Sequence, residues 1–395
     1  MIDTKTAIEK ITNGEFDNLF TDIYIDSSMI DYQKKRYVHA IEQYETIFCP
    51  DKVAIFSAPG RSEVCGNHTD HQHGMVLATS INLDTIAVSA KNNNDVVRFV
   101  SDGYDMITLD INDLEVNNDE AGTTVSLIRG VLRGLKDHGY KIGGFNAYAT
   151  SDVLVGAGLS SSAAFEVVVG TIISGLYNDM KINSVEIAQI SQYAENVFFK
   201  KPCGLMDQMA CSVGGMVNID FKDPTKPIVK KVPTEFEKYD YSLCIVDTKG
   251  DHVDLTDDYA MIPSEMKKVA NFLGEDYLRD CDSNEFYIRL DEIREAVGDR
   301  PVLRAIHFFN EEYNVKNAVS SLENGKFVEF LDAIRKSGNS SFKYLQNVYT
   351  TRDIQHQNIS VALALSESLL RNYGVCRVHG GGFAGTIQAF VKNDF

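Results

Sequence analysis

The sequence is poor in basic residues and contains no tryptophan: 38 lysines and arginines stand against 56 aspartates and glutamates, and the formal net charge is −18. No stretch gathers enough lysine and arginine to form the basic face that nucleic-acid-binding proteins usually have. We therefore expect no nucleic-acid partner. An anionic substrate would need locally placed positive groups, because the balance of the whole chain is acidic.

Signals for secretion and membrane insertion are also missing. The first residues, MIDTKTAIEKITNGEF, carry charges and lack the apolar centre of a signal peptide. The apolar run Ala163 to Leu176 is too short to span a bilayer and contains Glu166. The seven cysteines are odd in number, scattered and without a CxxC pair, which is typical of reduced thiols. We expect a cytoplasmic protein with no membrane partner.

Length and composition favour more than one domain. The chain has 395 residues, of which 44% are hydrophobic, and this is enough for a large core. Three of the eight prolines fall in the stretch FKDPTKPIVKKVPTEF, residues 221–236. Such a change of composition is a candidate domain boundary. We predict two domains, residues 1–225 and 226–395.

Apolar spacing predicts helices and strands that interleave in both halves, so the expected fold class is α+β. A strand from Val53 is expected to end at the turn signal Pro59-Gly60. The other predicted elements are helices within residues 1–48 and over 124–138, 162–178 and 184–199, further helices after residue 247, and strands over 75–90, 144–150, 241–247 and 386–391.

The stretch VGAGLSSSAAFEVVVG, Val155 to Gly170, combines bare backbone with hydroxyl side chains at the start of a predicted helix. One interpretation is a glycine turn with a serine cap. The other is an anion site, because the first amides of a helix lack internal partners and carry a partial positive charge. A serine hydroxyl can also ligate Mg²⁺. The stretch is neither a P-loop nor a dinucleotide fingerprint, since the Gly-Lys-Ser/Thr ending and the third glycine are missing.

The stretch SAPGRSEVCGNHTDHQHGM, Ser57 to Met75, concentrates polar side chains between two predicted strands. His68 and His71 offer two ligands to a zinc ion, but no third ligand follows at a familiar spacing. A solvated polar loop is the plainer alternative. The guanidinium, amide, imidazole and carboxylate groups present here suit a polyol, in which each hydroxyl needs a donor and an acceptor.

Two further stretches combine glycines with reactive side chains. In AENVFFKKPCGLMDQMACSVGG, residues 194–215, Asp207 lies among apolar residues and must be paired or hydrogen-bonded. It is either a helix cap or a carboxylate poised against a substrate hydroxyl. Glu195 is either a surface residue or a metal ligand.

In RVHGGGFAG, residues 377–385, three consecutive glycines allow close approach of the backbone, as a flexible loop or as a lid near a phosphate.

The order of these four stretches resembles the GHMP family of small-molecule kinases and, within it, the galactokinases. The similarity extends from about Ala58 to Val391. GNHTDHQHGMVL is similar to the galactokinase signature Gly-Glu-His-Thr-Asp-Tyr, and CGLMDQ matches the stretch around the family's reactive-centre aspartate. The resemblance implies a two-domain GHMP kinase fold, with a ribosomal-protein-S5-like first domain, a ferredoxin-like second domain, and the nucleotide and sugar between them.

The resemblance also implies phosphorylation of the anomeric hydroxyl of D-galactose with ATP and Mg²⁺, giving galactose 1-phosphate and ADP. Asp207 matches the residue that orients or deprotonates this hydroxyl, and Arg61 matches the arginine beside it, which would keep Asp207 ionised. The other implied site residues are Asn67, His68, Asp70, Gly204 and Tyr259 for the sugar, Gly156, Ala157, Gly158, Leu159, Ser160, Ser161 and Ser162 for ATP, and Ser162 (or Ser161) with Glu195 for Mg²⁺. We expect a monomer.

Departures from the family pattern leave the substrate open. Asn67 replaces a glutamate that holds a sugar hydroxyl, often described as the one at C6, and His71 replaces a tyrosine. An amide would not repel a carboxylate, so a kinase for galacturonate, arabinose or N-acetylgalactosamine is the alternative. We expect Asn67→Glu to shift preference towards neutral galactose if Asn67 sets tolerance at C6. A sugar and ATP sensor with weak turnover is a third hypothesis, which the intact Asp207 and Arg61 disfavour.

Overall fold

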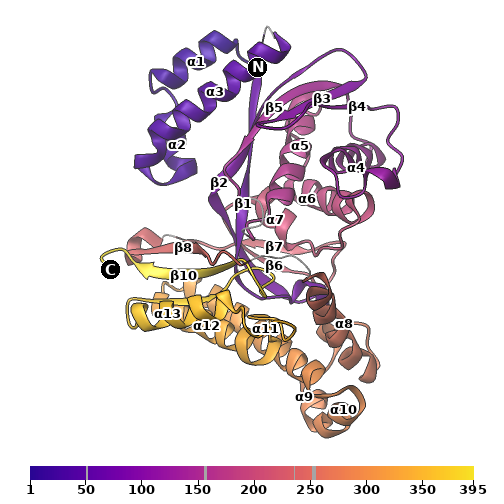
Figure 1. Cartoon of the computed structure of the whole chain (residues 1–395), viewed down its shortest axis with the longest axis vertical. Coiled ribbons are helices and arrows are strands. Elements are labelled where there is room, and N and C mark those ends of the chain that lie inside the picture. The colour runs from indigo at the N-terminus through magenta and orange to yellow at the C-terminus, as the bar shows by residue number, and fades with distance from the viewer. Residues whose placement is uncertain (50–51, 155–157, 235, 251–254) are drawn as a thin grey trace. The chain divides into compact units, whose positions relative to one another are not determined.

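The computed structural model describes residues 1–49, 52–154, 158–234, 236–250 and 255–395, and the chain divides into two compact units (Figure 1). The first unit comprises Met1–Arg61, Ser80–Leu154 and Ser160–Gly214, and the second comprises Ser62–Thr79, Val155–Leu159 and Gly215–Phe395. The units interleave along the sequence, because the chain passes from one to the other within strands β1 (Ala54–Cys65) and β2 (Met75–Lys91). The predicted domains 1–225 and 226–395, which meet at a single point, stay a prediction.

The first unit is built around a sheet in the order β4-β3-β5-β2, with β1 paired to β2. Strands β3 (Val96–Ser101) and β5 (Phe145–Ser151) are parallel, whereas β5 pairs with β2, and β3 with β4 (Ile107–Asp110), in the antiparallel sense. Side chains alternate between two cores: Ala147 contributes to one, and the register partners Val88 and Tyr148 contribute to the other. The sheet is therefore buried on both faces.

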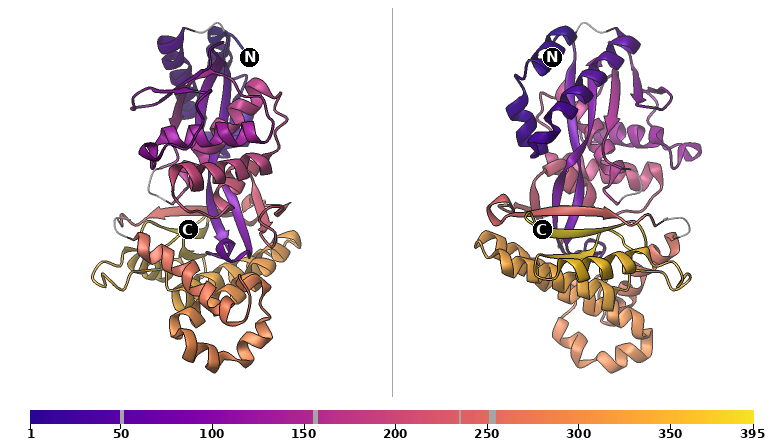
Figure 2. Two further views of the ribbon diagram at one scale, coloured as in Figure 1. Left: turned by 90° about the vertical axis from the view of Figure 1, so that its right-hand side faces the viewer. Right: turned by 60° about the vertical axis from the view of Figure 1, so that its left-hand side comes forward.

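Helices cover both faces of this sheet (Figure 1, Figure 2). The amino-terminal helices pack their apolar residues with Val88 and Tyr148, and the later helices pack theirs with Ala147. The first group is α1 (Thr4–Thr12), α2 (Asp17–Tyr24) and α3 (Ile30–Phe48), and the second is α4 (Thr124–Asp137), α5 (Ser161–Tyr177), α6 (Ser184–Tyr193), the π-helical turn Ala194–Phe199 and α7 (Met206–Val213).

The second unit combines two antiparallel sheets with a helical layer. The start of β2 pairs with β6, which pairs with β7, and a separate sheet has the order β8-β10-β9. Phe390 of β10 pairs with Val375 and packs with Phe330, which joins the second sheet to α12. The elements are β6 (Met216–Asp220), β7 (Ile228–Lys231), β8 (Tyr241–Asp247), α8 (Thr256–Phe272), α9 (Ser283–Ile288), α10 (Leu290–Val297), α11 (Asp299–Glu323), α12 (Phe327–Ser340), α13 (Asn358–Leu370), β9 (Gly374–Val378) and β10 (Thr386–Lys392).

Most predicted elements are confirmed, with two corrections. The first strand does not end at Pro59-Gly60, because β1 continues to Cys65; β1 pairs only with β2 among the described strands, and an edge without a pairing partner tolerates a proline that lacks an N–H. The helix predicted over 184–199 is α-helical only to Tyr193 and then widens into the π-helical turn. In the described ranges, no helix is both long and apolar enough to cross a bilayer.

Candidate active site

Asp207 lies in the first turn of α7, where Arg61 and Ser160 bind its two carboxylate oxygens. Arg61 donates from Nε to Oδ1 at 2.7 Å, and Ser160, directly before α5, donates from Oγ to Oδ2 at 2.5 Å. All three residues belong to the first unit. The sequence places Arg61 in a polar turn; the structure corrects this, because Arg61 lies on β1, and the strand rather than a loop holds it beside α7.

Two opposing effects set the charge of Asp207. Burial raises the pKa of this carboxyl group, but the Arg61 guanidinium and the Ser160 hydroxyl outweigh burial, so the pKa of Asp207 lies below its ordinary value. The Arg61 side chain is 7% exposed and the Asp207 side chain is 31% exposed. Asp207 is therefore an ionised carboxylate that an incoming hydroxyl can reach.

Ser160 does not act as a conventional cap for α5. Its backbone is left-handed, with φ 59°, and its side chain makes no capping bond to the helix because the hydroxyl is turned to Asp207. The amides at the start of α5, beginning at Ser161, therefore keep the positive end of the helix available to an anion. The same serine thus connects the glycine-serine stretch to the carboxylate of α7.

The residues of the predicted phosphate loop fall in both units. Gly156 and Ala157 lie outside the described residues. Gly158 has φ +72°, a backbone angle that favours glycine, and a Cβ atom there would make a tight contact with Thr386 Oγ1 at 3.2 Å. Leu159 is buried.

Glu195 is the centre of a second polar cluster in the first unit. Its Oε1 accepts from Ser162 Oγ at 3.1 Å and pairs with Lys201 Nζ at 2.9 Å, and its Oε2 accepts from Gln208 Nε2 at 2.6 Å. The side chain is only 3% exposed. Of the two alternatives given for Glu195, a surface residue or a metal ligand, the first is therefore wrong. The π-helical turn that carries Glu195 aims it at α5 and α7.

Gln208 joins Glu195 to a further carboxyl group, Glu166 of α5. Its Nε2 also donates to Glu166 Oε2 at 3.2 Å. Glu166 is fully buried, and this burial, followed by the charge of Glu195, raises its pKa well above the ordinary value. The surroundings of Glu166 therefore favour its protonated form.

Ser162 and Glu195 fit the predicted Mg²⁺ site in their chemistry. A hydroxyl and a carboxylate meet at 3.1 Å, and both are hard oxygen ligands of the kind that Mg²⁺ prefers alongside phosphate and water. Glu195 Oε1 already attracts a cation, the ammonium group of Lys201. The zinc alternative raised for His68 and His71 gains no support from the structure. Across the described ranges, no group of three or more His, Cys, Asp or Glu side chains is arranged to hold a metal ion.

In the second unit, the predicted sugar residues contact the glycine-rich loop. His68 Nε2 lies 3.0 Å from the carbonyl oxygen of Gly381, and Tyr259 donates from its hydroxyl to the carbonyl of Gly382 at 2.8 Å. Burial lowers the pKa of His68 to about 3. The ring is therefore neutral at pH 7, and with Nε2–H donating, Nδ1 is an acceptor for a hydroxyl.

Asn67 differs from its neighbours because it is fully buried. Its Nδ2 donates to the carbonyl oxygen of Gly380 at 2.7 Å and to Glu63 at 3.0 Å, while its Oδ1 accepts from Asn347 at 2.7 Å and from Ser341 at 3.3 Å. The amide hydrogens and oxygen lone pairs of Asn67 are thus used within the protein. This arrangement does not support the expected direct contact of Asn67 with a sugar.

The remaining sugar residues are less constrained. Asp70, half-buried, accepts from the amide of His71 at 3.0 Å, and the rings of His68 and His71 are stacked with centroids 5.9 Å apart. Gly204 is half-buried and lies two residues before α7, in the first unit with Asp207.

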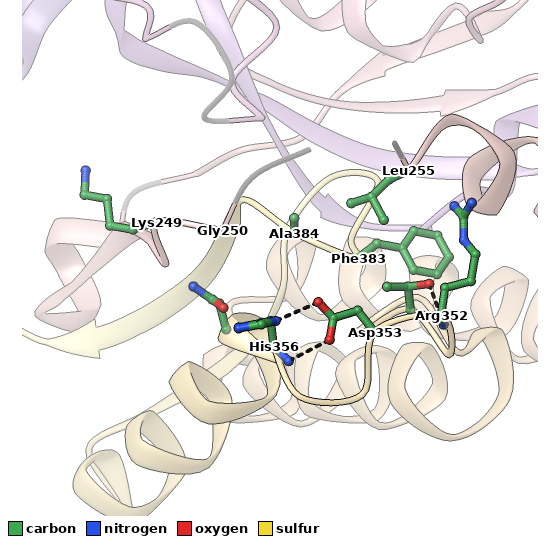
Figure 3. A pocket seen from close by; sticks show the side chains of 10 residues that line it. Lys249, Gly250, Leu255, Arg352, Asp353, His356, Phe383 and Ala384 are labelled. Carbon is green, nitrogen blue, oxygen red and sulfur yellow. Dashed lines mark hydrogen bonds and ion pairs between the residues drawn. The ribbon is translucent and has the colours of Figure 1, made fainter. Parts of the chain in front are cut away.

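A cavity of about 560 Å³ lies elsewhere in the second unit, by Phe383 and Ala384 (Figure 3). Its basic side chains are paired with carboxylates: Arg352 is bound to Asp258, Lys249 Nζ lies 2.6 Å from Asp247, and His356 Nδ1 lies 2.7 Å from Asp353. Among the described residues that line this cavity, none is a predicted catalytic, sugar, phosphate or metal residue. We therefore do not assign the active site to it.

Sequence reasoning missed three members of the Glu195 cluster: Lys201, Gln208 and Glu166. Gln208 directly follows Asp207, and Lys201 directly precedes Pro202, so both lay within the quoted stretch. Glu166 was visible as a charge in an apolar helix, which signals a buried, partnered carboxyl group. These patterns show that a polar cluster exists, but not which atoms meet.

Comparison with known proteins gives the same picture. Residues 126–215 match the GHMP kinases N terminal domain, and residues 42–91 match the galactokinase galactose-binding signature. A galactokinase of Limosilactobacillus reuteri is 30% identical over 366 residues, which cover 89% of each chain, and one of Streptomyces coelicolor is 28% identical over 358 residues, covering 89% of this chain and 88% of that one.

Solved structures share the fold. The Lactococcus lactis galactokinase in complex with galactose superposes with a TM-score of 0.77 at 23% identity and covers 89% of each chain. A phosphomevalonate kinase of Streptococcus pneumoniae superposes with a TM-score of 0.59 at 15% identity, covering 86% of this chain and 92% of that one. The expected two-domain GHMP kinase fold is therefore confirmed, and the chain belongs to the galactokinase family of the GHMP kinases.

Proposed function

We propose that the protein transfers the γ-phosphoryl group of ATP to the anomeric hydroxyl of D-galactose, giving galactose 1-phosphate and ADP. The observation that carries this proposal is the Asp207 carboxylate, ionised by Arg61 at 2.7 Å and oriented by Ser160 at 2.5 Å beside the start of α5. The carboxylate can bind the sugar hydroxyl, and the positive end of the helix can bind the phosphates of ATP. Ser160 joins the two groups.

The groups present divide the work of the reaction. Asp207 accepts the hydrogen bond of the sugar hydroxyl and so aims its oxygen at the γ-phosphorus. As the new P–O bond forms and the bond to the β-phosphate oxygen breaks, the hydroxyl becomes more acidic and its proton can pass to Asp207. Because the pKa of Asp207 is lowered, it is a weak base, and its main contribution is orientation. Arg61 and the α5 amides offset the negative charge of the phosphoryl group.

Mg²⁺ belongs to this proposal as the ion held by Ser162 and Glu195. Bound there, it would neutralise phosphate charge and fix the phosphate geometry. The chain's own contribution is to keep Glu195 in place, because Gln208 holds one of its carboxylate oxygens.

The sugar contacts stay expectations within the same proposal. His68, Asp70, Gly204 and Tyr259 are proposed to bind the sugar, with neutral His68 accepting a hydroxyl at Nδ1. Seven unpaired cysteines are consistent with a reducing compartment, and we propose that the enzyme works in the cytoplasm as a monomer with monosaccharide and ATP as its ligands.

The test is ADP release from purified protein with Mg-ATP across galactose, galacturonate, N-acetylgalactosamine, arabinose and glucose, with Asp207→Asn as the blank. We expect galactose to give the highest kcat/KM. A clear preference for another sugar would replace galactose as the substrate. Binding of sugar and ATP without turnover would favour the sensor instead.

A further inference from the structure

Three side chains contact the glycine-rich loop, two from the loop that carries Asn67 and His68 and one, Tyr259, from α8. Asn67, His68 and Tyr259 contact the carbonyl oxygens of Gly380, Gly381 and Gly382 in that order. Asn67 is the fully buried member of the three. Its main-chain oxygen is bound as well, by His307 Nε2 at 2.9 Å. Asn67 thus fastens the loop from both its backbone and its side chain.

The orientation of the Asn67 amide follows from its partners. The Gly380 carbonyl and the Glu63 carboxylate are acceptors, so the nitrogen of Asn67 must face them. On the other side, Asn347 Nδ2 and Ser341 Oγ are donors and meet the oxygen. A carboxylate at position 67 would turn one of its oxygens towards two acceptors.

Glu63 supplies a negative charge next to Asn67 in this buried network. Its Oε2 accepts from Asn67 and its Oε1 pairs with Arg377 Nη2 at 3.1 Å. The side chains of Arg377 and Glu63 are 0% and 3% exposed. The charge of Arg377 also acts on the fully buried Glu311, so a further carboxylate next to Glu63 would share one cation with two carboxylates already present.

We infer that Asn67 is a positioning residue whose identity is dictated by Glu63, and that it does not read the sugar at C6. The pair Glu63–Asn67 holds one carboxylate and one donor. The negative charge expected at position 67 in the family pattern resides on Glu63 in this chain, four residues earlier. Sugar tolerance at C6 is then set by other residues. The kinetic part of this inference rests on the proposed function, whereas the part concerning the pair does not.

A double-mutant cycle tests the pair without any assay of activity. Asn67→Asp keeps the volume but adds a carboxylate, and we expect its Tm to fall by about 5 °C or more. Glu63→Gln/Asn67→Asp reverses the polarity of the pair and retains one carboxylate, so we expect at least half of that loss to be regained. A Tm of the double variant that is equal to or lower than that of Asn67→Asp would overturn the inference. Glu63→Gln alone is measured as the second single variant of the cycle.

A kinetic arm separates positioning from sugar contact. Asn67→Ser removes the amide without adding charge, and galactose is compared with 6-deoxygalactose. Because a positioning residue affects all sugars alike, we expect both kcat/KM values to fall while their ratio changes by less than about twofold. A loss of about tenfold or more confined to galactose would show that Asn67 binds the C6 hydroxyl. If wild-type protein phosphorylates neither sugar, the proposed function fails and the Tm cycle still decides the inference.

Discussion

Two of this protein's arginine–carboxylate pairs, Arg61–Asp207 in the first unit and Arg377–Glu63 in the second, are used differently. Arg61 and Asp207 leave the carboxylate 31% exposed, and its second oxygen accepts from a serine hydroxyl. Arg377 and Glu63 are almost fully buried, and the second carboxylate oxygen is bound by Asn67. The same ion pair is thus suited to chemistry when one side stays open, and to fixing a loop when every side is closed.

The largest expected effect is the loss of the exposed carboxylate. We expect Asp207→Asn to lower kcat by about 10³-fold while ATP affinity stays within about threefold, because the carboxylate acts at the sugar hydroxyl. Steady-state kinetics and calorimetric ATP titration measure the two quantities. Near-normal turnover in this variant would remove Asp207 from the mechanism.

Replacing Arg61 and Arg377 in turn tests directly whether the two ion pairs have different roles. We expect Arg61→Met to lower kcat by about 10- to 100-fold, because the charge that offsets the phosphoryl group is lost. The pKa of Asp207, now held below its ordinary value, would rise. The acidic limb of the kcat profile reflects ionised Asp207, so it would move to higher pH. A pH–rate series on both proteins measures this shift.

Arg377→Met is the matched variant in the second unit. It leaves Glu63 buried without its cation, so we expect a fall in Tm of about 5 °C or more and no movement of the acidic limb. The comparison fails if Arg377→Met shifts that limb, or if Arg61→Met destabilises the protein as strongly as Arg377→Met does.

A smaller effect is expected at the Glu195 cluster. Lys201 pairs with the oxygen of Glu195 that also faces Ser162, so its ammonium group competes with a metal ion for that oxygen. Lys201→Met should tighten Mn²⁺ binding in the absence of nucleotide by about threefold, as judged by electron paramagnetic resonance, since one exposed charge has a modest effect. Weaker Mn²⁺ binding in this variant would contradict the competition, and Lys200→Met serves as the control.

The smallest effect concerns the pH dependence of stability. The folded-state pKa of His68 is lowered to about 3, so between about pH 6.5 and 3 the unfolded chain binds a proton that the folded protein does not. This residue therefore costs stability as the pH falls through that window. His68→Gln should reduce the slope of unfolding free energy against pH by up to about one proton. An unchanged slope in urea titrations across the window would contradict it.

The sequence predicted the chemistry of the first unit better than the packing of the second. A partner for Asp207 could be expected because a carboxylate among apolar residues must be paired or hydrogen-bonded. That Arg61 is this partner was implied by the resemblance to galactokinases. The burial of Asn67 could not be found, since an asparagine that binds a sugar and one that binds Asn347, 280 residues later, look alike in sequence. Likewise, Pro59 signals a turn unless the strand is known to lie at an edge.

Close packing around the glycine-rich loop limits which sequences can adopt this fold. A Cβ atom at Gly381 would come within 2.5 Å of the Tyr259 ring, and one at Gly382 would collide with the backbone oxygen of Asn347. A larger residue at 381 is therefore tolerated only together with a smaller one at 259. Across related sequences these two positions should vary as a pair, whereas position 382, blocked by main chain, should remain glycine whatever its neighbours become.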